Sequence, residues 1–128
     1  MRRHAITLGA VLAAVLGPFG GTATARAAGE VPHARLVISV GSVTRTLTCY
    51  PEGGDHPRAA EACAELQSAG GAVERVPPMP GTLCIALWDP VKISVVGRWP
   101  GTPVEFSQTA SNSACGAISH GHVFLLDG

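Results

Sequence analysis

Apolar and polar residues alternate along two adjacent stretches near the start of the chain. Residues 34–48, ARLVISVGSVTRTLT, form two β-branched runs on either side of Gly41 and Ser42. A two-residue loop that begins with glycine suits a type II′ turn, which matches the twist of the strands that flank it. The pattern therefore predicts a β-hairpin.

A helical period replaces the alternation in the next segment. Residues 50–56, YPEGGDH, are typical of a turn, and Asp55 is expected to cap a helix whose first turn accepts Pro57. Apolar residues then recur at helical spacing, at Ala59, Ala62, Cys63 and Leu66. Gly70 and Gly71 are expected to end this helix.

The second half of the chain returns to alternation after a proline-rich loop at 76–81. Residues 91–95 and 104–107 alternate apolar with polar side chains and are predicted to be half-buried strands. The apolar run His122–Leu126 is predicted to be a closing strand. Strands that flank one clear helix indicate the α+β class, an antiparallel sheet with helices on one face.

The N-terminus has the features of a secretory signal. Arg2 and Arg3 precede an apolar run at 5–16, and small residues follow it. The run is shorter than the roughly 20 apolar residues that a membrane-spanning helix needs. Residues 1–28 are therefore predicted to be a signal peptide cleaved after Ala25, Ala27 or Ala28, and residues 29–128 a secreted, extracellular domain without a membrane anchor.

The charge balance bears on the kind of partner. The formal net charge of the whole chain is zero, but from residue 29 onward six basic residues face nine acidic ones. A mildly acidic domain without a Lys/Arg cluster argues against nucleic acid or an anionic membrane as the partner. An uncharged partner or a protein partner fits better.

Four cysteines lie in the predicted mature domain, at Cys49, Cys63, Cys84 and Cys115. An even number in an exported chain indicates two disulfides, and their spacing leaves all three pairings open. No two are close enough for a zinc knuckle, so neither a metal nor another cofactor is predicted.

Catalytic motifs are missing from the sequence. It contains no G-x-S-x-G, H-E-x-x-H, P-loop or G-x-G-x-x-G, and its acidic residues are scattered singly. The sequence therefore predicts that the protein is not an enzyme. One alternative is a secreted metal or ligand carrier that uses His56, His120 and His122.

The segment TLCIALWDP, residues 82–90, combines apolar side chains with the boundaries of a loop. It can be read as an extended loop, tethered by Cys84, that resembles a protease substrate. Equally, it can be a buried strand whose apolar residues fill the core. By residue type alone, Trp88 and Trp99 are both expected at or near the core.

Several motifs together resemble the Streptomyces subtilisin inhibitor family from about Leu36 to Phe124. They are TLTC at 46–49, H-P-x-A-A-x-A-C at 56–63, C-x-x-x-W-D-P-V at 84–91, S-N at 111–112 before Cys115, and H-G-x-V-F at 120–124. Each motif is weak alone, but their order and spacing are specific.

The resemblance implies a five-stranded antiparallel sheet with two helices packed on one face, disulfides joining Cys49 to Cys63 and Cys84 to Cys115, and a homodimer. It implies a secreted inhibitor of serine endopeptidases, subtilisin-like ones first, whose partner is an extracellular serine protease. A non-inhibitory secreted binding module of the same fold is the alternative.

The family's functional positions fall on one loop of this sequence. The reactive bond is expected between Ala86 (P1) and Leu87 (P1′), and the rest of the reactive loop includes Leu83 (P4), Cys84 (P3), Ile85 (P2) and Trp88. Asn112 is expected to support this loop by hydrogen bonds. Three features depart from the family pattern: Ile85 stands where proline is frequent, two residues rather than one separate Asn112 from Cys115, and the first hairpin is shorter than usual.

Overall fold

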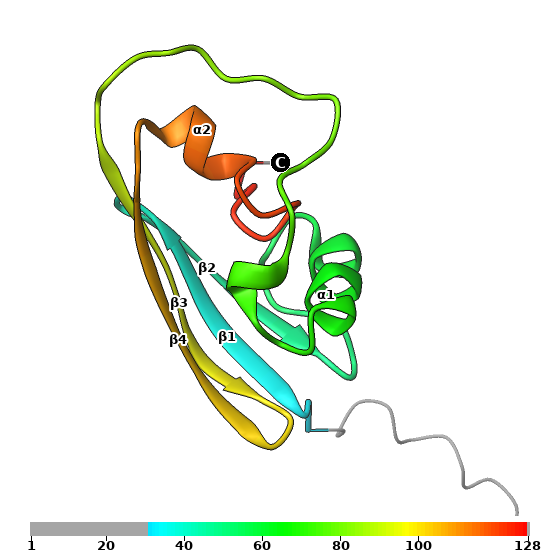
Figure 1. Cartoon of the computed structure of the whole chain (residues 1–128). Helices are drawn as coiled ribbons and strands as arrows, with labels where there is room; N and C mark the ends of the chain where they lie inside the picture. The colour runs from blue at the N-terminus through cyan, green and yellow to red at the C-terminus, as the bar shows by residue number, and fades with distance from the viewer. Residues whose placement is uncertain (1–30, 128) are drawn as a thin grey trace, which may run out of the picture.

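A computed structural model describes residues 31–127, in which four strands form one antiparallel sheet (Figure 1). β1 (Ala34–Val40) and β2 (Val43–Cys49) pair across the turn at 41–42, so the predicted hairpin is confirmed. β3 (Val91–Trp99) and β4 (Thr102–Ala110) contain the two later strands predicted from alternation. The strand order is β2-β1-β3-β4.

One face of the sheet carries the core. α1 (Ala59–Ser68), the 3₁₀ turn η2 (Val73–Arg75), α2 (Ser113–Ala117) and the C-terminal segment all lie on this side (Figure 1). The strand residues that point toward them are fully buried: Leu36, Ile38, Leu47, Ile93 and Val95. Their neighbours on the opposite face, such as Val37 and Val96, are exposed. The alternation in the sequence is thus the alternation between a covered and an open face.

The expected five-stranded sheet is wrong, because the apolar run His122–Leu126 forms no strand. Val123 and Phe124 are both completely buried, whereas consecutive strand residues point to opposite faces. The backbone turns on itself, with the Val123 N–H donating to the His120 carbonyl at 3.1 Å. Apolar residues in this segment reach the core from a coil.

Glycine ends α1 where the sequence indicated. The Gly71 N–H donates to the Leu66 carbonyl at 2.8 Å and the Gly70 N–H to the Gln67 carbonyl at 3.1 Å, the bond pattern of a Schellman motif. Both glycines have positive φ, which side chains of L-residues disfavour. The reversal sends the chain directly into η2.

The predicted cap at the other end of α1 is wrong. Asp55 does not cap the helix; its Oδ1 accepts hydrogen bonds from the Thr46 backbone N–H at 2.6 Å and the Thr46 hydroxyl at 3.0 Å. These bonds hold the pKa of Asp55 below its ordinary value, led by the bond from the backbone N–H. The carboxylate thus satisfies an outward-facing donor on edge strand β2.

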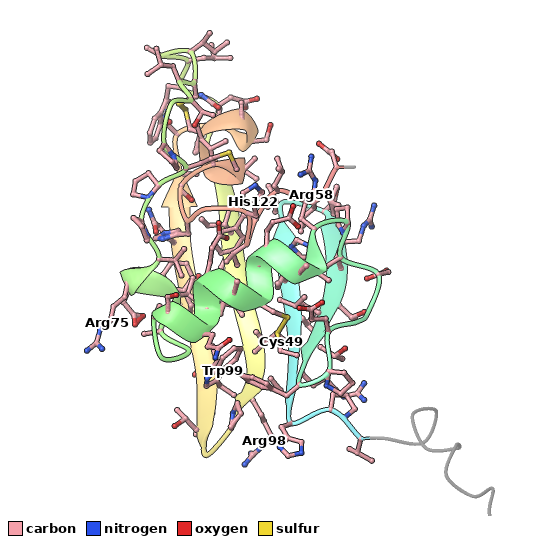
Figure 2. The ribbon with its side chains drawn as sticks, turned by 90° about the vertical axis from the view of Figure 1, so that its right-hand side faces the viewer. Cys49, Arg58, Arg75, Arg98, Trp99 and His122 are labelled. Carbon is pink, nitrogen blue, oxygen red and sulfur yellow. A yellow bond between two sulfur atoms is a disulfide. The ribbon has the colours of Figure 1, made fainter. Side chains whose placement is uncertain are left out.

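A disulfide joins Cys49, at the end of β2, to Cys63 in α1, with 5.8 Å between the Cα atoms. It fixes the helix to the sheet beside the buried Trp99, as the labelled side chains in Figure 2 show.

No helix within residues 31–127 has the length and apolar character that a bilayer crossing requires. The predicted signal peptide, residues 1–28, lies outside the described residues.

His56 links the start of α1 to the C-terminal segment. Its Nε2–H donates to the Val123 carbonyl at 2.9 Å, and its Nδ1 accepts from the Arg58 N–H at 2.9 Å. This arrangement requires a neutral ring. Burial lowers the pKa of His56 and outweighs the bond to Val123, which acts in the opposite direction.

We expect the stability of the domain to fall on mild acidification because of His56. Below its ordinary pKa of about 6.5, the unfolded chain binds a proton before the folded chain does, so the free energy of unfolding decreases until the pH has passed the lowered folded pKa. Urea unfolding between pH 8 and 4 measures this. His56→Gln should flatten the curve below about pH 6.5, and the same change at exposed His33 is the control. Identical pH profiles for the parent and His56→Gln would contradict the assignment.

Candidate functional site

The longest connection in the fold runs from Val76 to Pro90 and arches over α2 (Figure 1). Every residue from 81 to 90 is exposed. The exposed fraction is 97% for Leu83 and 73% for Trp88. The interpretation of this segment as a buried strand is therefore wrong, as is the placement of Trp88 near the core, whereas Trp99 is buried. Neighbouring apolar side chains held in solvent are typical of an interaction surface.

A disulfide between Cys84 and Cys115 ties this loop to α2, with 5.2 Å between the Cα atoms. The structure thus has the same two pairings that the family resemblance implies. α2 is a firm anchor despite its five residues, because a Cβ on Gly116 would come within 3.0 Å of Ile93 and 3.1 Å of Ala110. The glycine lets the helix lie directly on β3 and β4.

Asn112 makes the second connection between the loop and the core. Its side-chain Nδ2 donates to the Leu87 carbonyl at 2.8 Å and to the Ile85 carbonyl at 3.2 Å. Its Oδ1 accepts from the Cys115 N–H at 2.8 Å, so Asn112 is also the N-cap of α2. Asn112 is buried, although the loop that it binds is exposed.

The spacing between Asn112 and Cys115 explains how one side chain does both. An N-cap oxygen bonds the N–H of the second or third helical residue, and Cys115 is the third residue of α2. With the oxygen occupied in this way, the amide NH₂ points toward the loop. Two residues, rather than one, separate Asn112 from Cys115. With this spacing, the N–H that bonds to the cap and the sulfur that forms the disulfide both belong to Cys115.

Two further backbone hydrogen bonds shape the exposed segment. The Leu87 N–H donates to the Ile85 carbonyl at 3.0 Å, which closes a γ-turn around Ala86. The Asp89 N–H donates to the Ser111 carbonyl at 2.7 Å. The sequence did not single out Ser111, because a backbone carbonyl leaves no trace in residue type. Ala86 is thus presented at the centre of a segment bonded on both sides.

The three histidines of the carrier hypothesis have separate partners. His122 Nδ1 lies 2.7 Å from Glu65 Oε2, His120 contacts the Val76 carbonyl and Gln108, and His56 contacts Val123. Within the described part of the chain, no three His, Cys, Asp or Glu side chains form a group that could hold a metal ion.

Comparison with known proteins shows which proteins this chain resembles. A family model described as "Subtilisin inhibitor-like" matches residues 31–112. The chain is 36% identical over 135 residues to a protein of Streptomyces longisporus named trypsin inhibitor STI2, covering 93% of this chain and 92% of that one. It is 40% identical over 134 residues to a subtilisin inhibitor of Streptomyces violaceus, covering 88% and 89%.

A solved structure has the same fold. It is sermetstatin of Streptomyces caespitosus in complex with Bacillus licheniformis subtilisin, with a TM-score of 0.60, 24% sequence identity, and coverage of 74% of this chain and 98% of that one. At this identity the likeness concerns the fold.

We expect the two roles of Asn112 to separate in a pair of variants. Asn112→Ser keeps a cap oxygen but loses the NH₂ group, and Asn112→Ala loses both. Each should raise the mobility of Leu87 and Trp88 in ¹⁵N relaxation measurements. Only Asn112→Ala should also lose the cap, which costs about 1 kcal/mol of the free energy of unfolding in urea. A loop that stays as rigid as the parent's in Asn112→Ser would show that the side chain does not brace it.

Proposed function

The chain belongs to the subtilisin inhibitor-like family, and on this premise we propose that it is a secreted inhibitor of serine endopeptidases that occupies the protease active site with residues 83–88. The family is one of protease inhibitors and not of enzymes. The observation that carries the proposal is the exposed apolar loop, which is held to the core by a disulfide and by the side chain of Asn112.

The proposed mechanism needs no catalytic residue on the inhibitor. The loop enters the cleft as a substrate does, and its backbone bonds to the protease like an added strand. Because Cys84 and Asn112 already restrict the loop, little conformational entropy is lost on binding. After cleavage, the disulfide on one side of the bond and the Asp89–Ser111 hydrogen bond on the other hold the new ends near each other.

The position of Asn112 supports the placement of the reactive bond between Ala86 and Leu87. The two carbonyls that it binds belong to Ile85 and Leu87, one on either side of Ala86. We therefore propose Ala86 as P1, with Ile85 as P2 and Cys84 as P3. Leu83, as P4, projects an almost fully exposed apolar side chain.

Side-chain chemistry points to the class of protease. A methyl group at P1 offers no charge to the acidic pocket of a trypsin. It would leave a large chymotrypsin-type pocket partly empty, without the roughly 1.5–3 kcal/mol that a buried Leu or Phe contributes. The apolar P4 residue Leu83 suits subtilisin-like enzymes. We therefore propose an extracellular subtilisin-like protease as the first target.

The open face of the sheet supports the proposal of a homodimer. Val37 and Val96 are paired in register, and both are exposed. Beside them, Ser39 pairs with Ser94, so these two pairs carry no charge, whereas Arg35 and Arg98 lie on one side of them and Glu105 lies next to Val96. A second copy would cover this surface while leaving the loop, at one end of the molecule, free for the protease.

Secretion is supported by the predicted signal peptide and by the two disulfides.

We expect the mature chain, residues 29–128, to abolish subtilisin activity at one protease per loop in an active-site titration. Its mass in solution, measured on the same sample by sedimentation, gives the number of loops per particle. An excess of mature chain that leaves subtilisin active would identify a binding module that has lost inhibition.

A single change at P1 should redirect the inhibitor. Ala86→Lys is expected to create inhibition of trypsin while leaving the melting temperature unchanged, because Ala86 is exposed and outside the core. Leu87→Lys is the matched control and should leave trypsin active. If Leu87→Lys inhibits trypsin while Ala86→Lys does not, the reactive bond lies elsewhere.

A further inference from the structure

The first limb of the loop, residues 76–83, is held differently from the second. Its covalent anchor comes only at its end, at Cys84, and three of the four residues from Pro77 to Pro80 are prolines. Proline has no backbone N–H, so Met79 carries the one backbone donor of that stretch. This N–H donates to the Ile118 carbonyl at 3.0 Å. The Val76 N–H donates to the Val73 carbonyl at 3.0 Å, so any further backbone hydrogen bond to residues 76–80 must use their carbonyl oxygens.

His120 supplies such a hold where the limb begins. Its Nδ1 lies 3.0 Å from the carbonyl oxygen of Val76. A carbonyl can only accept, so Nδ1 carries the hydrogen and donates it. Val76 is itself almost completely buried, and exposed Pro77 follows it. The bond thus fixes the last peptide group before the chain leaves the core.

The imidazole of His120 is in turn fixed by the rest of the fold. Its Nε2 lies 3.1 Å from Oε1 of Gln108 in β4. With the two ends of this amide exchanged, the NH₂ group donates to Nε2. The ring packs edge-on against Phe106 at 5.3 Å and against Phe124 at 5.8 Å between centroids. In Figure 1 the red C-terminal segment that contains His120 lies beneath the arch, close to its green start. His120 therefore holds Val76 at a fixed position relative to β4 and the core.

We propose that His120 is a positioning residue of the inhibitor: by holding the Val76 carbonyl it sets the direction in which the proline-rich limb carries Leu83 and Ala86 to the protease. The inference rests on the proposed function. Prolines fix φ near −65° at residues 77, 78 and 80. At the turn of Pro80 and Gly81, the Thr82 hydroxyl donates to the Met79 carbonyl at 2.8 Å. A change of direction at Val76 is therefore carried along the limb instead of being absorbed. His120 acts through Val76 and does not contact the protease.

His122 provides a matched control, because it lies in the same segment but faces away from the loop. Its backbone N–H and its Nδ1 both contact the Glu65 carboxylate of α1, at 2.6 and 2.7 Å. Figure 2 shows His122 beside α1. A purely structural role of the C-terminal segment would be disturbed by changes at either histidine. A positioning role belongs to His120 alone.

The test compares three variants of the mature chain at His120 and His122. His120→Phe keeps a ring for the aromatic contacts but removes the donor. His120→Asn restores a donor near the place of Nδ1, and His122→Ala removes the side-chain contact to Glu65. Amide hydrogen exchange of Met79 is measured in the free protein. The rate of cleavage between Ala86 and Leu87 is measured during long incubation with subtilisin.

We expect Met79 exchange and loop cleavage to rise about fivefold in His120→Phe, the factor that corresponds to one ordinary hydrogen bond. Both should return toward the parent's values in His120→Asn and stay at those values in His122→Ala. If His120→Phe fails to fold, Gln108→Leu in edge strand β4 removes the contact that holds the His120 ring. This variant should give a smaller rise in both rates. Equal effects of His120→Phe and His122→Ala, or none on Met79, would overturn the inference. A parent chain that does not inhibit subtilisin would overturn the proposed function, while Met79 exchange would still decide the role of His120.

Discussion

Asn112 joins the exposed loop to the folded domain through one buried amide group. Its oxygen starts α2, and its nitrogen holds two loop carbonyls. Because the loop residues 81–90 are exposed, no burial of apolar surface can fix their conformation. Directional bonds must do so, and the amide works with the disulfide at Cys115, three residues further along. The rigidity proposed for inhibition depends on this point.

The strands were predictable where one face of the sheet is covered and the other is open. That asymmetry produces the alternation of apolar and polar residues seen at 91–95 in β3 and at 104–107 in β4, whereas β1 also has apolar Val37 on its open face. The run His122–Leu126 was misread because burial alone does not distinguish a strand from a coil. Its fixed points are the side chains of Glu65 and His56, far away in sequence, and no local pattern reports such contacts.

The candidate site was predictable only in part from residue type. The segment 82–90 stood out as an apolar loop, but the same residues also fitted a buried strand, and the cysteine spacing left three pairings. The family motifs favoured the loop over the strand and one of the three cysteine pairings. Asp55 was predicted to cap α1 because its residue type is typical of caps. Its carboxylate instead accepts a hydrogen bond from the Thr46 N–H of β2, because an edge strand also has backbone donors without strand partners. The ties from Ser111 and Ile118 use backbone carbonyls, which every residue possesses.

The exposure of every residue from 81 to 90 separates the side chains that can contact a partner from those that stabilise the fold. Since none of these side chains is part of the core, most exchanges among them leave the folding free energy nearly unchanged. Only Cys84 and the backbone conformation are held by the scaffold. Side chains of the proposed contact surface can therefore change while the domain beneath it stays folded. A lineage that meets new proteases can change its target by exchanging a few side chains, without evolving a new fold.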